Sequence, residues 1–201
     1  SEGIIASGNI NEYHWMFKLS CQTDFVTKNE LFIELSEKII KIIEEYKPHN
    51  LEQLNIHIKD LILEYVSRIG EKIIISDFVA KKGQYKHYIY DKRVGVLVHY
   101  LDHNNHFDEE VAKKIAMHIT AMNPKYKELN EISNEIIEKE RELLRQESIR
   151  NNVRADMIEK SLDGKLKKLF SEMVLSEQKY LFDETKKLSD IYSTIDFVRF
   201  F

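Results

Sequence analysis

Residues 21–29 read Cys-Gln-Thr-Asp-Phe-Val-Thr-Lys-Asn, and they lie where a strand pattern changes into a helix pattern. The preceding residues, 13–21, are rich in aromatic side chains and partly alternate apolar with polar positions, as a half-buried strand does. From Asp24 onward, apolar residues recur at three- and four-residue spacing, which predicts an amphipathic helix. Pro48 ends this helix, because proline has no N–H to donate inside a helix.

The rest of the chain also alternates predicted strands with predicted helices. Neighbouring strands are separated by short turn sequences, so they are expected to form antiparallel hairpins. Residues 94–98 are apolar on both faces, which indicates a central strand. These patterns together predict an α+β fold. The predicted strands are 4–8, 13–21, 72–79, 87–90, 93–101 and 195–201, and the predicted helices are 24–47, 51–67, 109–122, 133–150 and 154–172.

Two of these helices combine a narrow apolar stripe with dense charge. Charges of alternating sign fill residues 138–150, and Asn151-Asn152 supplies a turn before the next helix begins. Long charged helices with little apolar surface bury it best against each other. The pattern therefore predicts a projecting antiparallel helical hairpin.

Composition excludes several classes of protein. The 201 residues are 43% hydrophobic and 32% charged, which suits one compact domain or two small ones. A net charge of −4 argues against nonspecific binding to nucleic acid. No apolar run approaches the roughly 20 residues of a membrane-spanning helix, and neither a secretory nor a transit segment is recognisable. A single cysteine allows no internal disulfide and fits a reducing compartment.

The sequence holds few candidates for catalysis or metal binding. Its six glycines form no phosphate-binding loop, and no zinc-ligand spacing occurs. Cys21 with a histidine is a candidate nucleophile pair, although the end of a strand favours a small core residue. His99, His103 and His106 are candidate metal ligands, but a solvated polar loop is the favoured interpretation. We therefore expect no active site, no cofactor and no metal.

The stretch 21–29 resembles the signature of the translation elongation factor Ts family, in which Thr-Asp-Phe-Val follows a strand and leads into a helix. Similarity continues in the family's order through residues 68–73, 93–98, 115–119 and 164–170, and so covers nearly the whole chain. The resemblance implies an α+β core of two small antiparallel-sheet and helix sub-domains with an inserted antiparallel helical hairpin. The expected parts are residues 1–112 for the first sub-domain, 113–131 with 166–201 for the second, and 132–165 for the hairpin.

The same resemblance implies a nucleotide-exchange factor without an active site of its own. Such a factor binds GDP-bound elongation factor Tu and promotes release of GDP during protein synthesis. The resemblance implies that Thr23, Asp24, Phe25 and Val26 contact this partner, with Phe25 acting as a wedge and Asp24 fixing its placement. Without the resemblance, Phe25 would be interpreted as a core residue at a helix start and Asp24 as a helix N-cap.

Three further residues are expected at the partner interface from the resemblance alone. They are Val94 and Gly95 on the predicted central strand and His118 on the helix that follows. Core packing is the alternative for Val94. His118 lies on an apolar helix, where a satisfied core residue or an interface residue is favoured over a catalytic one.

Other expectations concern how the chain acts. Family members carry an N-terminal helical module that has no counterpart in these 201 residues, so an adaptor that binds elongation factor Tu without exchange is the alternative function. A homodimer or a 2:2 complex is an expected assembly. Cytoplasm is the expected location, with the mitochondrion or plastid as the alternative, and no direct contact with nucleic acid or membrane is expected.

Overall fold

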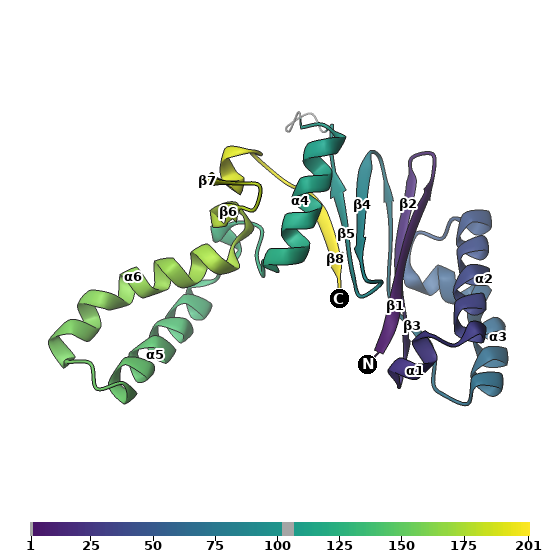
Figure 1. Cartoon of the computed structure of the whole chain (residues 1–201), viewed down its shortest axis with the longest axis horizontal. Helices are drawn as coiled ribbons and strands as arrows, with labels where there is room; N and C mark the ends of the chain where they lie inside the picture. The colour runs from purple at the N-terminus through teal and green to yellow at the C-terminus, as the bar shows by residue number, and fades with distance from the viewer. Residues whose placement is uncertain (1, 102–106) are drawn as a thin grey trace. The chain divides into compact units, whose positions relative to one another are not determined.

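The computed structural model describes residues 2–101 and 107–201 (Figure 1). The chain is α+β, as predicted. Its internal contacts divide it into two compact units, one formed by Ser1–Thr120 with Asp196–Phe201 and the other by Ala121–Ile195. The three-part division into sub-domains and hairpin, which came from the family resemblance, stays a prediction.

The first unit begins with a three-stranded antiparallel sheet. Its strands are β1 (Glu2–Ile10), β2 (Tyr13–Cys21) and β3 (Ile74–Lys82), in the order β1-β2-β3. Helices α2 (Glu30–Tyr46) and α3 (Leu51–Ile69) lie on one face of this sheet (Figure 1). Between helices and sheet lies a large apolar core, which includes Trp15, Phe17, Phe32, Ile39, Leu54 and Tyr65.

The helix that the sequence predicts to start at residue 24 is interrupted. A four-residue helix, α1 (Asp24–Thr27), has its C-cap at Lys28, and α2 starts at Glu30. The side chain of Asn29 accepts a hydrogen bond from the N–H of Leu31 at 2.8 Å and so caps α2. The prediction of one continuous helix was wrong here, because a local cap competes with the helical hydrogen bonds.

A second sheet completes the strands of this unit. It contains β4 (Tyr85–Tyr90), β5 (Val94–His99) and β8 (Phe197–Phe200) in the order β4-β5-β8, which confirms that residues 94–98 form a central strand. Asp91 and Lys92 both have positive φ, as a tight hairpin turn requires. The side chains of Ile5, Met16, Tyr85 and Leu97 pack together and join this sheet to the first one. Helix α4 (Glu109–Met122) follows, and the carboxylate of Asp108 caps it by accepting a hydrogen bond from the N–H of Val111 at 3.0 Å.

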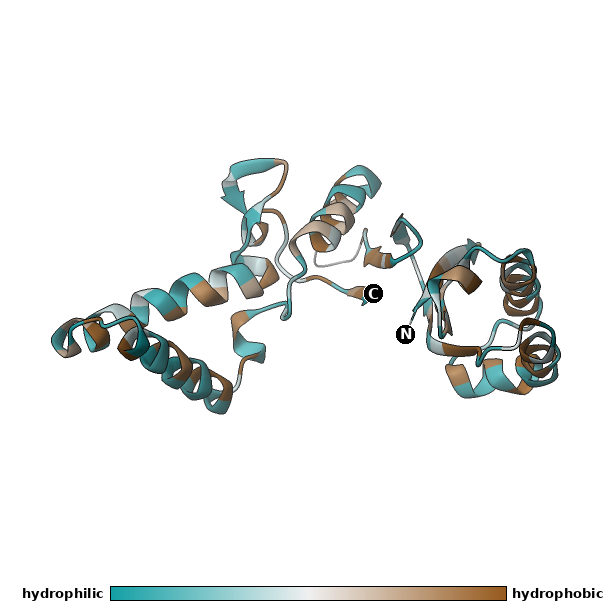
Figure 2. Ribbon diagram, turned by 60° about the horizontal axis from the view of Figure 1, so that its bottom comes forward, coloured by the Kyte–Doolittle hydropathy of each residue, from teal (hydrophilic) through white to brown (hydrophobic). Residues whose placement is uncertain are grey.

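The second unit is dominated by two charged helices, α5 (Asn134–Arg150) and α6 (Ala155–Met173). They run in opposite directions (Figure 1), and Arg145 bonds Glu159 between them at 2.7 Å. Apolar residues form separate patches on these largely hydrophilic helices (Figure 2). The sequence patterns missed a small hairpin of β6 (Lys179–Tyr180) and β7 (Asp183–Lys187), whose strands are too short for a periodic pattern. Three short 3-10 helices, η1 (Leu129–Glu131), η2 (Leu175–Glu177) and η3 (Leu188–Asp190), complete the unit.

Acid is expected to destabilise the first unit through a histidine pair that links its two sheets. His14 Nδ1 and His87 Nε2 lie 2.7 Å apart, an arrangement in which one ring donates and the other accepts. Burial, together with the charges of His14 and Lys86, lowers the pKa of His87 to about 4. The unfolded chain therefore binds more protons than the folded one below the ordinary histidine pKa, and stability falls as the pH falls. Between about pH 7.5 and about pH 5 we expect a loss of about 1–2 kcal/mol in urea unfolding.

A variant series separates this effect from general acid sensitivity. His87→Asn should make the stability profile less steep above about pH 5, because it removes the histidine whose pKa is lowered to about 4, while His14, whose pKa burial also lowers, remains. His49→Gln changes an exposed histidine and should keep the slope of the unaltered protein. Equal slopes in all three proteins would contradict the assignment to the His14–His87 pair.

Candidate functional site

Phe25 stands out because it is a large apolar side chain that is 83% exposed. It lies on α1, directly after β2 ends at Cys21. The next residue, Val26, is 7% exposed and belongs to the main core. Val26 therefore anchors the short helix while Phe25 projects from it. The interpretation of Phe25 as a core residue was wrong.

The loop before Phe25 is held by one carboxylate. Glu71 Oε2 accepts hydrogen bonds from the N–H groups of Gln22 and Thr23, each at 3.1 Å. Glu71 Oε1 accepts from the Thr23 hydroxyl at 2.6 Å. The Thr23 hydroxyl bond is the main cause that lowers the pKa of Glu71, so the carboxylate is ionised near neutral pH and accepts through both oxygens.

Asp24 is the first residue of α1 and is exposed. The N-cap position belongs to Thr23, so the interpretation of Asp24 as the N-cap was wrong. Among the described residues, no hydrogen-bond partner occupies the Asp24 carboxylate, although Thr27 bonds the Asp24 backbone carbonyl at 2.6 Å. An exposed carboxylate beside an exposed aromatic ring offers a partner one charged and one apolar contact.

Cys21 is poorly suited to nucleophilic catalysis. It is 3% exposed, and its thiol donates to the carbonyl of Thr23 at 3.2 Å. Burial, followed by the negative charges of Glu71 and Glu2, raises the pKa of the Cys21 thiol. Because the thiolate is the nucleophile, these surroundings disfavour the reaction that a cysteine–histidine enzyme would need.

The histidine-based metal hypothesis finds no support in the part of the chain that the structure describes. Within residues 2–101 and 107–201, no three potential ligand side chains gather around a common point. His103 and His106 lie outside the described residues, and His99 packs its ring 4.8 Å from that of Tyr85. Over the same ranges, no helix has both the length and the apolar character needed to cross a membrane.

The other three expected partner-binding residues lie apart from the Phe25 loop in the sequence and are more buried. Val94 is half-buried, Gly95 is buried, and His118 is fully buried on α4. A Cβ at Gly95 would lie 2.6 Å from Met16 Sδ and 2.7 Å from Ile5 Cγ2. Packing between the two sheets thus explains the glycine, and partner contact at these three residues stays a prediction.

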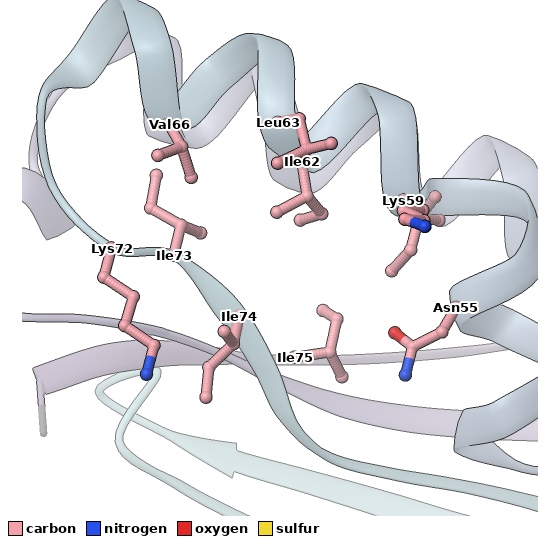
Figure 3. A pocket seen from close by; sticks show the side chains of 10 residues that line it. Asn55, Lys59, Ile62, Leu63, Val66, Lys72, Ile73, Ile74 and Ile75 are labelled. Carbon is pink, nitrogen blue, oxygen red and sulfur yellow. The ribbon is translucent and has the colours of Figure 1, made fainter.

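The first unit also carries an apolar groove. It measures about 530 Å³ and runs between α3 and the start of β3 (Figure 3). Ile58, Ile73 and Ile75 are buried in it, whereas Leu63 and Ile74 remain exposed. Lys72, the residue after Glu71 in the sequence, also lines the groove.

Comparison with known proteins identifies the family. A family model described as Elongation factor TS matches residues 22–200. The chain belongs to the elongation factor Ts family. The Elongation factor Ts of Buchnera aphidicola subsp. Baizongia pistaciae is 32% identical over 191 residues, which cover 92% of this chain and 70% of that protein. The Elongation factor Ts of Symbiobacterium thermophilum is 30% identical over 190 residues, covering 90% and 62%, and that of Herminiimonas arsenicoxydans is 29% identical over 207 residues, covering 97% and 69%.

Membership in the elongation factor Ts family gives the chain a role in translation elongation and hence in protein biosynthesis. The family match includes the exposed Phe25, the loop before it and Glu71. Sequence reasoning identified the loop but missed Glu71. The resemblance had covered residues 68–73, yet nothing in the pattern showed that this carboxylate folds back onto Thr23.

Proposed function

We propose that this chain binds GDP-bound elongation factor Tu and accelerates the release of GDP, with Phe25 as the inserting side chain. Family membership supports the role in elongation. The observation that carries the mechanism is the 83% exposure of Phe25 next to the anchored Val26. A large apolar side chain held in water by a fixed backbone is suited to enter an apolar site on a partner.

The physical basis is the way in which nucleotide-binding proteins hold a diphosphate. Backbone N–H groups of a loop, a helix N-terminus and a bound Mg²⁺ all point at the phosphates, so their binding energy depends on accurate placement. Phe25 inserted between partner helices displaces these groups, and the Asp24 carboxylate accepts hydrogen bonds that fix the insertion. No covalent bond is made or broken, so the factor requires no active site.

Exchange also requires that factor and nucleotide oppose each other's binding. By linkage, the factor weakens GDP binding by the same free energy by which GDP weakens binding of the factor. The factor therefore needs contacts besides Phe25, for which Val94, Gly95 and His118 remain the proposed residues. We place this exchange in the cytoplasm, since the relatives come from bacteria.

The test is release of a fluorescent GDP analogue from elongation factor Tu with increasing amounts of this chain. Acceleration that saturates with concentration supports exchange. Binding without acceleration would replace the proposal by the adaptor function, and absence of binding would reject both. Light scattering of the mixture would distinguish a 1:1 complex from the expected 2:2 complex.

A further inference from the structure

Glu71 accepts hydrogen bonds from the loop of Gln22 and Thr23, which precedes Phe25. We infer that Glu71 is a positioning residue, which holds the loop of Gln22 and Thr23 so that Phe25 meets the partner in one orientation. This inference rests on the proposed function. Glu71 itself need not touch the partner, because it acts through the loop.

The chain delivers this carboxylate by a specific turn. Helix α3 ends at Gly70, whose φ of 83° lies in the left-handed region that glycine adopts without strain. The N–H of Gly70 bonds the carbonyl of Val66 at 2.9 Å and closes the helix. The next residue is Glu71, and β3 begins three residues later at Ile74. A helix end therefore places the carboxylate against a loop that lies 48 residues earlier in the sequence.

The three hydrogen bonds constrain the loop more than they stabilise the fold. Both oxygens of the carboxylate are used, and the two N–H groups that it binds belong to consecutive residues. The site is at the surface, so water can replace lost hydrogen bonds at little net cost. Removal of the charge should therefore leave the fold intact and let the loop adopt other conformations. Only the fraction of molecules with Phe25 correctly placed would then be competent.

The first experiment compares Glu71→Gln with Glu64→Gln in the GDP-release assay. Glutamine keeps the size of the side chain but loses the charge and one acceptor oxygen. We expect Glu71→Gln to lower the maximal release rate at saturating factor about tenfold, with an unfolding midpoint close to that of the unaltered protein. Glu64→Gln removes an exposed carboxylate of α3 that pairs with Arg68 at 3.4 Å, and it should leave the rate unchanged.

Non-additivity distinguishes positioning from a direct contact with the partner. If Glu71 acts through the loop, Glu71→Gln should lower the rate no further in a protein that already carries Phe25→Ala. Thr23→Val removes the 2.6 Å bond while keeping the shape of the side chain, and it should overlap with Glu71→Gln in the same way. Full additivity of Glu71→Gln with Phe25→Ala would overturn the inference.

Amide hydrogen exchange of the isolated protein tests the contact without the partner. The N–H groups of Gln22 and Thr23 should exchange hydrogen faster in Glu71→Gln than in the unaltered protein. In Glu64→Gln they should exchange at the rate of the unaltered protein. Unchanged protection at both amides would overturn the inference even if exchange activity fell. If the unaltered protein did not accelerate GDP release at all, the proposed function would be rejected. Faster amide exchange in Glu71→Gln would then still support Glu71 as the residue that holds the loop.

Discussion

Phe25→Ala is expected to lower the maximal acceleration of GDP release about 100-fold, because aromatic residues at the centre of an interface commonly contribute most of its binding energy. The fold should be nearly unaffected. Phe25 is 83% exposed, so truncating it removes little packing within the protein. We expect the free energy of unfolding to change by about 0.5 kcal/mol or less. Stopped-flow release of a fluorescent GDP analogue, with a urea unfolding curve for each protein, measures both quantities.

Ile56→Ala is the matched control for this variant. Ile56 is also a large apolar residue, 74% exposed, and lies on α3 in the same unit. The Ile56→Ala variant should accelerate the release of GDP from elongation factor Tu as strongly as the unaltered protein does. If Phe25→Ala kept the full rate, exposure of an aromatic side chain would have been misinterpreted and the wedge would be rejected.

Gly95→Ala is expected to have the largest effect on stability, a loss of about 1–3 kcal/mol. The added Cβ would meet Met16 Sδ at 2.6 Å, Ile5 Cγ2 at 2.7 Å and Ile89 Cδ1 at 2.9 Å. Met16 is fully buried and Ile5 nearly so, and a packed interior gives these side chains little room to move. Chemical unfolding of the variant should show an earlier midpoint.

The same variant separates the two roles considered for Gly95. A packing role predicts lower stability and, at temperatures where the variant is folded, nearly normal GDP release. A direct partner contact predicts normal stability and slower release, and that result would contradict the packing role. Gly164→Ala serves as a control for the glycine-to-alanine substitution itself. Beyond the adjoining residues and the nearby backbone of α6, no atom lies within 4 Å of a Cβ at Gly164, and alanine favours a helix over glycine by about 1 kcal/mol.

Most elements of the fold were predictable because their signals are local. Apolar spacing located α2, α3 and α4, and the capping residues Asp108 and Ser133 lie where the sequence placed helix starts. The break between α1 and α2 was missed because the apolar period continues across it, while a single cap at Asn29 interrupts the hydrogen bonding. The β6–β7 hairpin was not predicted for the opposite reason. Its strands of 2 and 5 residues are too short to show a periodic pattern of apolar residues.

The candidate site was predictable only in part. The resemblance of residues 21–29 to a family signature located the loop, and the family match confirmed the family. Exposure of Phe25 could not be derived from periodicity, because a phenylalanine at a helix start fits a core position equally well. Burial of Gly95 and His118 likewise depends on neighbours that are distant in the sequence.

By itself, the sequence determined the α+β class, the strand-to-helix junction and the resemblance to elongation factor Ts, because each depends on residue types at short, fixed spacing. Only the tertiary structure decided which side chain of the junction faces water and what holds its loop. Val26 is buried and Phe25 exposed because a four-residue helix packs one side on the core. Glu71 reaches Thr23 across 48 residues because the turn at Gly70 returns the chain to the end of β2, and a contact of that range leaves no local pattern.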